Sequence, residues 1–156
     1  SKRSAMTCYR IGWAAGDENI ISAFRKLKTN IDSGTPTFIQ DAAVTAISDE
    51  AHVEKMRSGY KQKRDILVGA LKSAGLEDCT PPAAMYIWQK CPRGTDSVEF
   101  AKKLLGKDAA IVVTPGEWIS NNFNGFNPGK DYVRFALVPT VEECKIAAER
   151  ISKLNF

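Results

Sequence analysis

One stretch decides the fold of this 156-residue chain: Tyr132-Val133-Arg134-Phe135-Ala136-Leu137-Val138. All of its residues except Arg134 are apolar or aromatic, and β-branched and aromatic residues favour strands. The stretch therefore predicts a buried strand that carries one guanidinium. Burying an unpaired charge costs on the order of several kcal/mol. Arg134 must accordingly be paired, exposed to solvent, or positioned to bind an anion.

The sequence on both sides of this strand predicts a compact α/β unit. Thr140 and Glu143 have the spacing of a capping box, which starts a helix after the strand. Residues 84–89 and 110–113 favour two further strands, and Asp96 caps a helix between them. The order strand, helix, strand, strand, helix is typical of an α/β fold.

The first half of the chain predicts helices and no sheet. Behind the N-cap Asp17, apolar residues recur at helical spacing: Ile20, Phe24, Leu27 and Ile31. Thr35 as cap and Pro36 in the first turn predict the start of a second helix. A long third helix is expected from about residue 49 to residue 74, with Gly75 as its C-terminal stop.

Two cations near the N-terminus suggest a phosphate-bearing ligand. Arg10 is the only charge in the stretch 9–16, where small residues let the backbone approach a ligand closely. A phosphate would satisfy both the charge and the space, and a structural ion pair is the alternative. Lys2 precedes Arg10 by eight positions. A lysine amine can form a Schiff base with an aldehyde cofactor, and a nearby arginine can hold that cofactor's phosphate.

Composition excludes several classes of protein. His52 is the single histidine, so a zinc site with several histidine ligands is impossible. The cysteines Cys8, Cys79, Cys91 and Cys144 form no C-x-x-C pair, as expected of reduced thiols in a cytoplasmic protein. The net charge of +4 is too small and too scattered to indicate nucleic acid. No apolar run is long enough to span a membrane.

The N-terminal stretch Ser1-Lys2-Arg3-Ser4-Ala5-Met6-Thr7-Cys8-Tyr9-Arg10-Ile11-Gly12 resembles the segment S-K-x-x-x-M-T-G-x-R-x-G of class I aminotransferases, which are pyridoxal-phosphate enzymes of fold type I. The resemblance continues along the chain to the strand with Arg134. It implies that Lys2 is the catalytic lysine that binds the cofactor, and that Ser1 and Arg10 lie at the cofactor's phosphate. It also implies that Arg134 binds the substrate's α-carboxylate. Cys8 stands where the family usually has glycine, which fits if φ is negative there.

The loop around Ser33 and Thr37 is expected to line the substrate site, in this family often from the neighbouring subunit. A turn followed by a helix cap is the alternative explanation of these residues. Tyr86 and Trp88 are either core residues of a strand or lining for the substrate's side chain.

The resemblance also implies an organisation in three parts. Residues 1–48 are expected to end the large cofactor-binding domain, residues 49–75 to form the connecting helix, and residues 76–156 to form the small α/β domain. The family's large domain precedes the lysine, so we expect this chain to be a C-terminal piece that is inactive alone. The implied cofactor is pyridoxal 5'-phosphate, the substrates are an amino acid and a 2-oxo acid, and the full-length protein is expected to be a homodimer.

Within the family, two features point to different substrates. Residues 124–138 with the following Glu142-Glu143-Cys144 are similar to N-succinyldiaminopimelate aminotransferases of lysine biosynthesis. The loop Asn30-Ile31-Asp32-Ser33-Gly34 is closer to aspartate and LL-diaminopimelate aminotransferases. The N-succinyl compound is our first expectation and the other two are alternatives. An α/β interaction module without catalysis is the alternative of another class.

Overall fold

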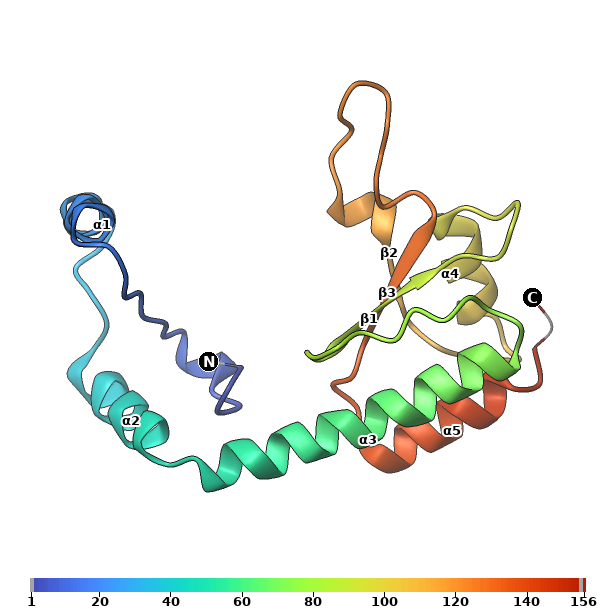
Figure 1. Ribbon diagram of the computed structural model, residues 1–156, viewed down its shortest axis with the longest axis horizontal. Coiled ribbons are helices and arrows are strands. Elements are labelled where there is room, and N and C mark those ends of the chain that lie inside the picture. Colours follow the sequence, from blue (N-terminus) through green and yellow to red (C-terminus); the bar gives the residue numbers. More distant parts are fainter. Residues whose placement is uncertain (1, 155) are drawn as a thin grey trace. The chain divides into compact units, whose positions relative to one another are not determined.

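The computed structural model describes residues 2–154 and 156. It divides into two compact units, Ser1–Met56 and Arg57–Phe156, which are described separately below. The elements follow one another in this order (Figure 1): η1 (Thr7–Tyr9), α1 (Glu18–Ile31), α2 (Thr37–Ser48), α3 (Ala51–Ser73), β1 (Tyr86–Lys90), α4 (Ser97–Leu105), β2 (Thr114–Pro115), η2 (Gly116–Ile119), β3 (Tyr132–Ala136) and α5 (Val141–Ile151). The predicted α/β class is confirmed.

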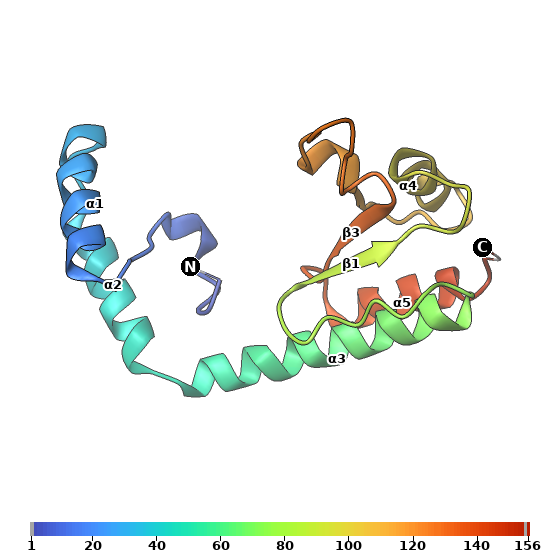
Figure 2. The same ribbon diagram turned by 45° about the horizontal axis from the view of Figure 1, so that its top comes forward.

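The second unit is built on a three-stranded antiparallel sheet in the order β1-β3-β2. Side chains alternate between its two faces. Ile87, Val133 and Phe135 lie on the buried face, each at most 4% exposed. They share one core cluster with Leu71 of α3, Phe100 and Leu104 of α4, and Cys144 and Ile151 of α5. In Figures 1 and 2, α3 and α5 run side by side against the sheet.

Local signals at the helix ends explain where the helices of this unit begin and stop. The side chain of Thr140 and that of Glu143 form the predicted capping box of α5. The carboxylate of Asp96 accepts hydrogen bonds from the backbone N–H groups of Val98 and Glu99 in the first turn of α4. At the end of α3, Gly75 has φ +89°, and the N–H groups of Gly75 and Leu76 bond back to Lys72 and Leu71. This is the pattern of a Schellman motif, which favours glycine at the left-handed position.

The helices of the first unit begin close to their predicted residues but bury no side chain. Asp17 caps α1, as predicted, by accepting hydrogen bonds from Asn19 and Ile20. The N-cap of α2 is Pro36 and not Thr35, and no side chain caps that helix. Proline fits there because its φ is fixed near the observed value of −53°. None of the residues of α1 or α2 is buried.

The strand predicted at residues 110–113 is wrong. Ile111 donates its N–H to the carbonyl of Leu104 at the end of α4, and Ala110 has φ +52° and bonds back to Gly106. The backbone there closes the turn after α4 instead of joining the sheet, and β2 consists of Thr114–Pro115 only. Among the described residues, none of the helices combines the length and hydropathy that a bilayer span requires.

Candidate functional site: an unpaired arginine and a lysine–arginine segment

The open face of the sheet in the second unit carries Tyr86, Trp88, Tyr132 and Arg134, which alternate with the buried residues of the same strands. The antiparallel register makes Trp88 on β1 and Thr114 on β2 the cross-strand partners of Arg134. Directly opposed residues of an antiparallel pair have their Cβ atoms about 4.5–5.5 Å apart. Trp88, Arg134 and Thr114 therefore form one row across this face.

The guanidinium of Arg134 has few protein partners. One of its terminal nitrogens, Nη2, lies 3.4 Å from the hydroxyl of Thr114, and its central carbon lies 4.7 Å from the centroid of the Tyr86 ring. Its Nε atom is buried and has no hydrogen-bond partner among the residues that the structure describes. In the part of the chain that the structure describes, no carboxylate forms an ion pair with Arg134. Of the three states that the sequence allows for Arg134, pairing with an internal carboxylate is therefore not found within residues 2–154 and 156.

This arrangement can bind a carboxylate. A guanidinium presents its N–H groups in a planar fork that fits two carboxylate oxygens. The Tyr86 ring supports the charge by a cation–π contact without using the donors. Half-burial among aromatic rings lowers the local dielectric constant, which strengthens the attraction to an anion. The described residues contain no group of histidine, cysteine or acidic side chains that could hold a metal ion.

In the first unit, Lys2 and Arg10 flank one short turn segment. Lys2 is exposed, and among the described residues its amine has no hydrogen-bond or ion-pair partner. Arg10 is also exposed, has φ +52°, and makes one hydrogen bond, from Nη1 to the carbonyl of Thr7 at 3.1 Å. The left-handed conformation costs a non-glycine residue free energy, and such strain clusters at ligand sites. Both cations are thus available to an anionic ligand.

The departure at Cys8 is explained by the backbone. Cys8 lies in the middle of η1, and its φ is not positive. A side chain is tolerated in that conformation, because only the left-handed region favours glycine. The condition that the sequence set for this substitution is met.

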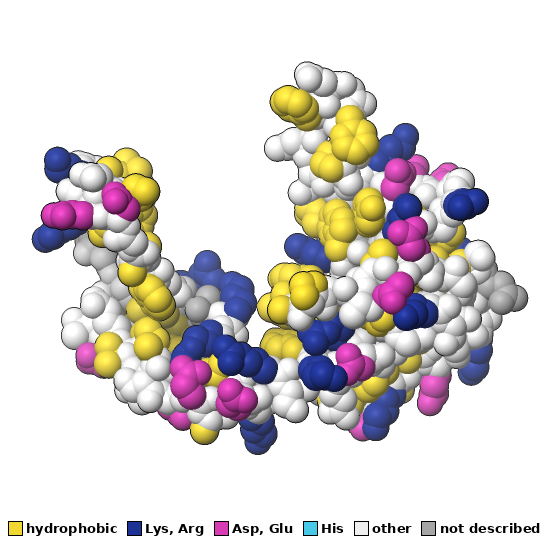
Figure 3. Space-filling model, in the orientation of Figure 1, with side chains coloured by type: hydrophobic (Ala, Val, Ile, Leu, Met, Phe, Trp, Pro, Cys, Tyr) yellow, Lys and Arg dark blue, Asp and Glu magenta, His cyan; other side chains and the backbone are white. Residues whose placement is uncertain are grey.

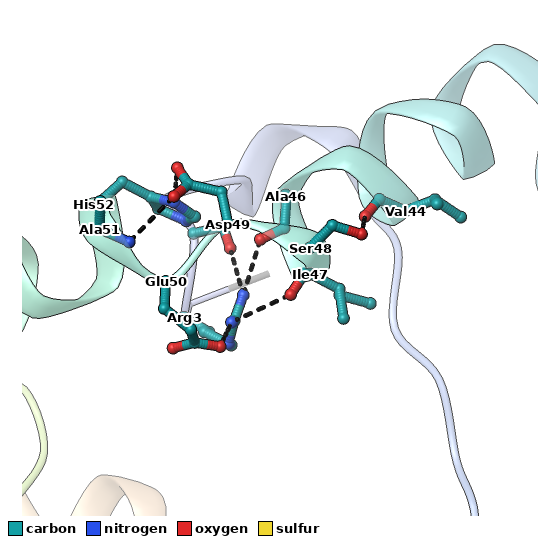
Figure 4. A network of polar contacts seen from close by, with 10 residues as sticks. Arg3, Val44, Ala46, Ile47, Ser48, Asp49, Glu50, Ala51 and His52 are labelled. Carbon is teal, nitrogen blue, oxygen red and sulfur yellow. Dashed lines mark hydrogen bonds and ion pairs between the residues drawn. The ribbon is translucent and has the colours of Figure 1, made fainter.

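Arg3, next to Lys2, anchors this segment to the end of α2 (Figure 4). Its guanidinium donates to the carbonyl of Ala46 at 2.8 Å and forms an ion pair with Glu50. A cation is favourable there because the last carbonyls of a helix carry partial negative charge. Asp49 then starts α3 by accepting the N–H of Ala51. Its pKa is lowered chiefly by the hydrogen bond with His52, whose Nδ1 lies 2.8 Å away.

Ser33 and Thr37 lie in the same unit, at the connection between α1 and α2, and both are exposed. Gly34, with φ +97°, donates its N–H to the side chain of Asp32. The pKa of Asp32 is lowered, first by its hydrogen bond with Lys28 and then by that with Gly34. This turn accounts for the residues between the helices without a ligand. Ser1 lies outside the described residues.

Thr114 is the contact residue that the sequence did not reveal. Its hydroxyl is the hydrogen-bonding neighbour of Arg134, yet the residue lies 20 positions earlier in the chain. Only the pairing of β2 with β3 identifies Thr114 as a neighbour of Arg134. The sequence placed this strand at residues 110–113, a few residues too early. Tyr86 was singled out, and its contact is with the arginine and not with the core.

Comparison with known proteins assigns the chain to a family. Residues 1–151 match the profile of the aminotransferase class I and II family. The chain belongs to this family. The enzymes of this family use pyridoxal phosphate, the cofactor that the stretch from Ser1 to Gly12 implies.

Relatives and solved structures extend the match along the chain. The LL-diaminopimelate aminotransferase of Syntrophobacter fumaroxidans is 39% identical over 158 residues, which cover 100% of this chain and 39% of that aminotransferase. An aminotransferase from Neisseria meningitidis superposes with a TM-score of 0.84 at 38% identity, over 97% of this chain and 38% of its own. A probable N-succinyldiaminopimelate aminotransferase from Thermus thermophilus gives a TM-score of 0.81 at 30% identity, over 97% and 39%. The chain thus spans about two fifths of the length of the aminotransferases that it matches.

Proposed function

We propose that the complete gene product containing this chain is a pyridoxal-phosphate-dependent aminotransferase that acts on an amino acid of the diaminopimelate type and a 2-oxo acid. The observation that carries the proposal is the guanidinium of Arg134, which is half-buried on an open sheet face without a carboxylate partner among the described residues. Amino acids and 2-oxo acids share one group that this guanidinium would recognise, the α-carboxylate.

The residues of the first unit fit the cofactor. It carries an aldehyde and a phosphate. Among the described residues, the segment offers an amine without a partner at Lys2 and, at Arg10, a guanidinium without a carboxylate partner. Ser1 would add a hydroxyl beside the phosphate. When bound, pyridoxal phosphate supplies a conjugated ring that takes up the electron pair left when the α-proton is removed. Lys2 would hold the cofactor and, once free, move the α-proton as a general base, while Arg134 orients the substrate.

The preferred substrate is a finer proposal. Residues 124–138 favour the N-succinyl compound, as does the likeness to the Thermus thermophilus protein. The name of the Syntrophobacter fumaroxidans relative favours LL-diaminopimelate. Aspartate is the third candidate. We retain N-succinyldiaminopimelate as the first choice, which places the protein in lysine biosynthesis.

Assembly and location follow from the same family assignment. We propose a homodimer in which the loop with Ser33 and Thr37 contributes to the substrate site, and a cytoplasmic location. Both Ser33 and Thr37 are exposed, which leaves them accessible to a neighbouring subunit. The family match argues against an interaction module without catalysis.

The test is transamination by the complete gene product with N-succinyldiaminopimelate, LL-diaminopimelate and aspartate, where the highest kcat/KM identifies the substrate. Removing the charged partner of a bound carboxylate costs about 2–5 kcal/mol. Arg134→Gln should therefore lower kcat/KM by about 30-fold or more, mainly through KM. Lys2→Arg should abolish turnover. Unchanged kcat/KM in Arg134→Gln would refute the assignment of the carboxylate site.

A further inference from the structure

We propose that Trp88 determines substrate specificity by forming an apolar wall beside the carboxylate site at Arg134, so that long side chains are preferred to short ones. This inference rests on the proposed function. It concerns the second unit alone, where Trp88 and Arg134 are cross-strand partners on the open face of the sheet.

The first step concerns which neighbours of Arg134 can still contact a ligand. The Tyr86 ring already carries the guanidinium, whose central carbon lies 4.7 Å from the ring centroid. Thr114 offers a small hydroxyl, which is in contact with the same group. Trp88 is the large apolar surface that remains in this row, and 36% of it is exposed.

The second step concerns how firmly the indole is held. Its ring stacks on Tyr132, with centroids 5.7 Å apart and planes 13° from parallel. On another side it lies against the backbone of Gly116, because a Cβ placed there would be 2.9 Å from Cη2 of Trp88. Gly116 in turn packs backbone to backbone against Gly129, since the same Cβ would be 2.4 Å from the carbonyl oxygen of Gly129.

The loop that provides this support is fastened at its base. Ser97 at the start of α4 accepts the N–H of Glu117 and donates its own N–H to the carbonyl of Lys130 at 2.7 Å. The hydroxyl of Ser120 donates to the carbonyl of Gly116 at 2.8 Å. Trp88 is therefore fixed from both sides although 36% of the residue is exposed. A ring fixed before binding loses little conformational entropy when a ligand packs against it.

The third step gives the class of substrate. A molecule whose carboxylate binds Arg134 must extend over a neighbouring residue, and Trp88 gives a methylene chain apolar surface to bury. Each buried methylene contributes a few-fold in affinity, about fourfold at most from transfer data. We therefore expect alanine to end short of the indole, and an amino acid with three or more methylenes to pack along it.

The test uses the complete gene product and unreactive probes, the straight-chain carboxylates from acetate to hexanoate, titrated by NMR. In the wild type, we expect affinity to rise about two- to fourfold per methylene. In Trp88→Ala and Trp88→Gln the rise should fall below about 1.5-fold per methylene, while the affinity for acetate stays within twofold. Trp88→Phe should restore most of the dependence on length. Phe123→Ala, an aromatic truncation at an exposed loop residue, is the matched control and should behave as the wild type.

The outcomes separate this inference from the proposed function. Equal length dependence in the wild type and both Trp88 variants refutes the role of Trp88, even if transamination is observed. Trp88-dependent affinity without transamination of any amino acid supports the wall and refutes the proposed function. In active enzyme, the ratio of kcat/KM for 2-aminopimelate to that for alanine should drop about tenfold in Trp88→Ala. That ratio does not depend on the fraction of folded protein.

Discussion

The two units use their apolar side chains in opposite ways. In the second unit, Leu71, Phe100, Leu104 and Leu137 are 0% exposed and belong to one contiguous core. In the first unit, the apolar stripe of α1 is exposed, from 48% at Phe24 to 69% at Ile20. Figure 3, in which α1 is seen end-on, shows exposed hydrophobic side chains on one side of that helix. Both units have well-formed helices, so the difference shows that local signals produce a helix without providing a core.

The difference has an energetic meaning. Short isolated helices are only marginally stable in water, because helix nucleation is costly and most helix stability in proteins comes from packing an apolar face. The core of the second unit supplies that packing, and the exposed stripe of α1 does not. Lys2 and Arg10 belong to the first unit and Arg134 to the second, so the candidate site residues differ in how well their surroundings are supported.

Hydrogen exchange of the 156-residue chain should show the largest contrast. We expect amides of β3 and α5 to be protected about 10³-fold or more, as in a domain stable by several kcal/mol. Amides of α1 should be protected less than about tenfold, since that helix buries nothing. Mass spectrometry of exchanged peptides measures both in one experiment. Similar protection in the two units would break the comparison.

Truncating one phenylalanine in each unit should give the next largest contrast. Phe100 is fully buried and makes an edge-to-face contact with Phe156, with ring centroids 5.1 Å apart. Phe100→Ala should lower the free energy of unfolding by about 3–5 kcal/mol. Phe24→Ala should change it by less than about 0.5 kcal/mol. Urea denaturation followed by circular dichroism measures both, and equal losses would contradict the contrast between the core around Phe100 and the exposed stripe of α1.

Two glycines of the second unit differ in the space around them, and alanine substitution should therefore have opposite effects on stability. A Cβ at Gly116 would lie 2.4 Å and 2.6 Å from two carbonyl oxygens, so Gly116→Ala should cost about 1–3 kcal/mol or more. Gly69 lies in α3 with open space around it, so Gly69→Ala should stabilise the helix by about 0.5–1 kcal/mol. The same denaturation experiment checks the opposite signs. If Gly116→Ala left the free energy of unfolding unchanged, this would contradict the close backbone approach that supports Trp88.

Acid unfolding should show the smallest contrast. In the second unit, the hydrogen bond from Lys72, followed by those from Thr80, lowers the pKa of Asp78 from 3.8 to about 2. A lowered pKa in the folded state stabilises above pH 4, and this contribution is lost as the pH falls from about 4 to about 2. Asp78→Asn should therefore reduce the fall of the urea midpoint across that range. Asp32→Asn in the first unit also removes a carboxyl group of lowered pKa, and it should leave the midpoint of the second unit unchanged.

The sequence predicted the parts of the fold that depend on neighbouring residues. Asp17, Asp96, Gly75 and the pair Thr140 and Glu143 each act within a few residues, and each marks a helix end in the structure. The strand at residues 110–113 was wrong because Ile111 bonds to the end of α4, a contact that β-propensity does not encode. Periodicity showed an apolar stripe on α1 and could not show whether it is covered.

For the candidate site too, the sequence showed one residue and could not show its neighbours. The lone charge of Arg134 was visible in the sequence, because it interrupts an apolar strand. Its neighbours Thr114 and Trp88 depend on the antiparallel register of three strands. Register is set by the whole sheet and its turns, so it cannot be obtained from one strand at a time.

The anchor at Arg3 has a consequence for the residue before it. With the guanidinium of Arg3 bound to the last carbonyls of α2 and to Glu50, the backbone beside Lys2 is fastened to a helix. The amine of Lys2 can then move only by rotation about its own four side-chain bonds. A molecule that reacts with this amine must therefore bind within the length of the lysine side chain.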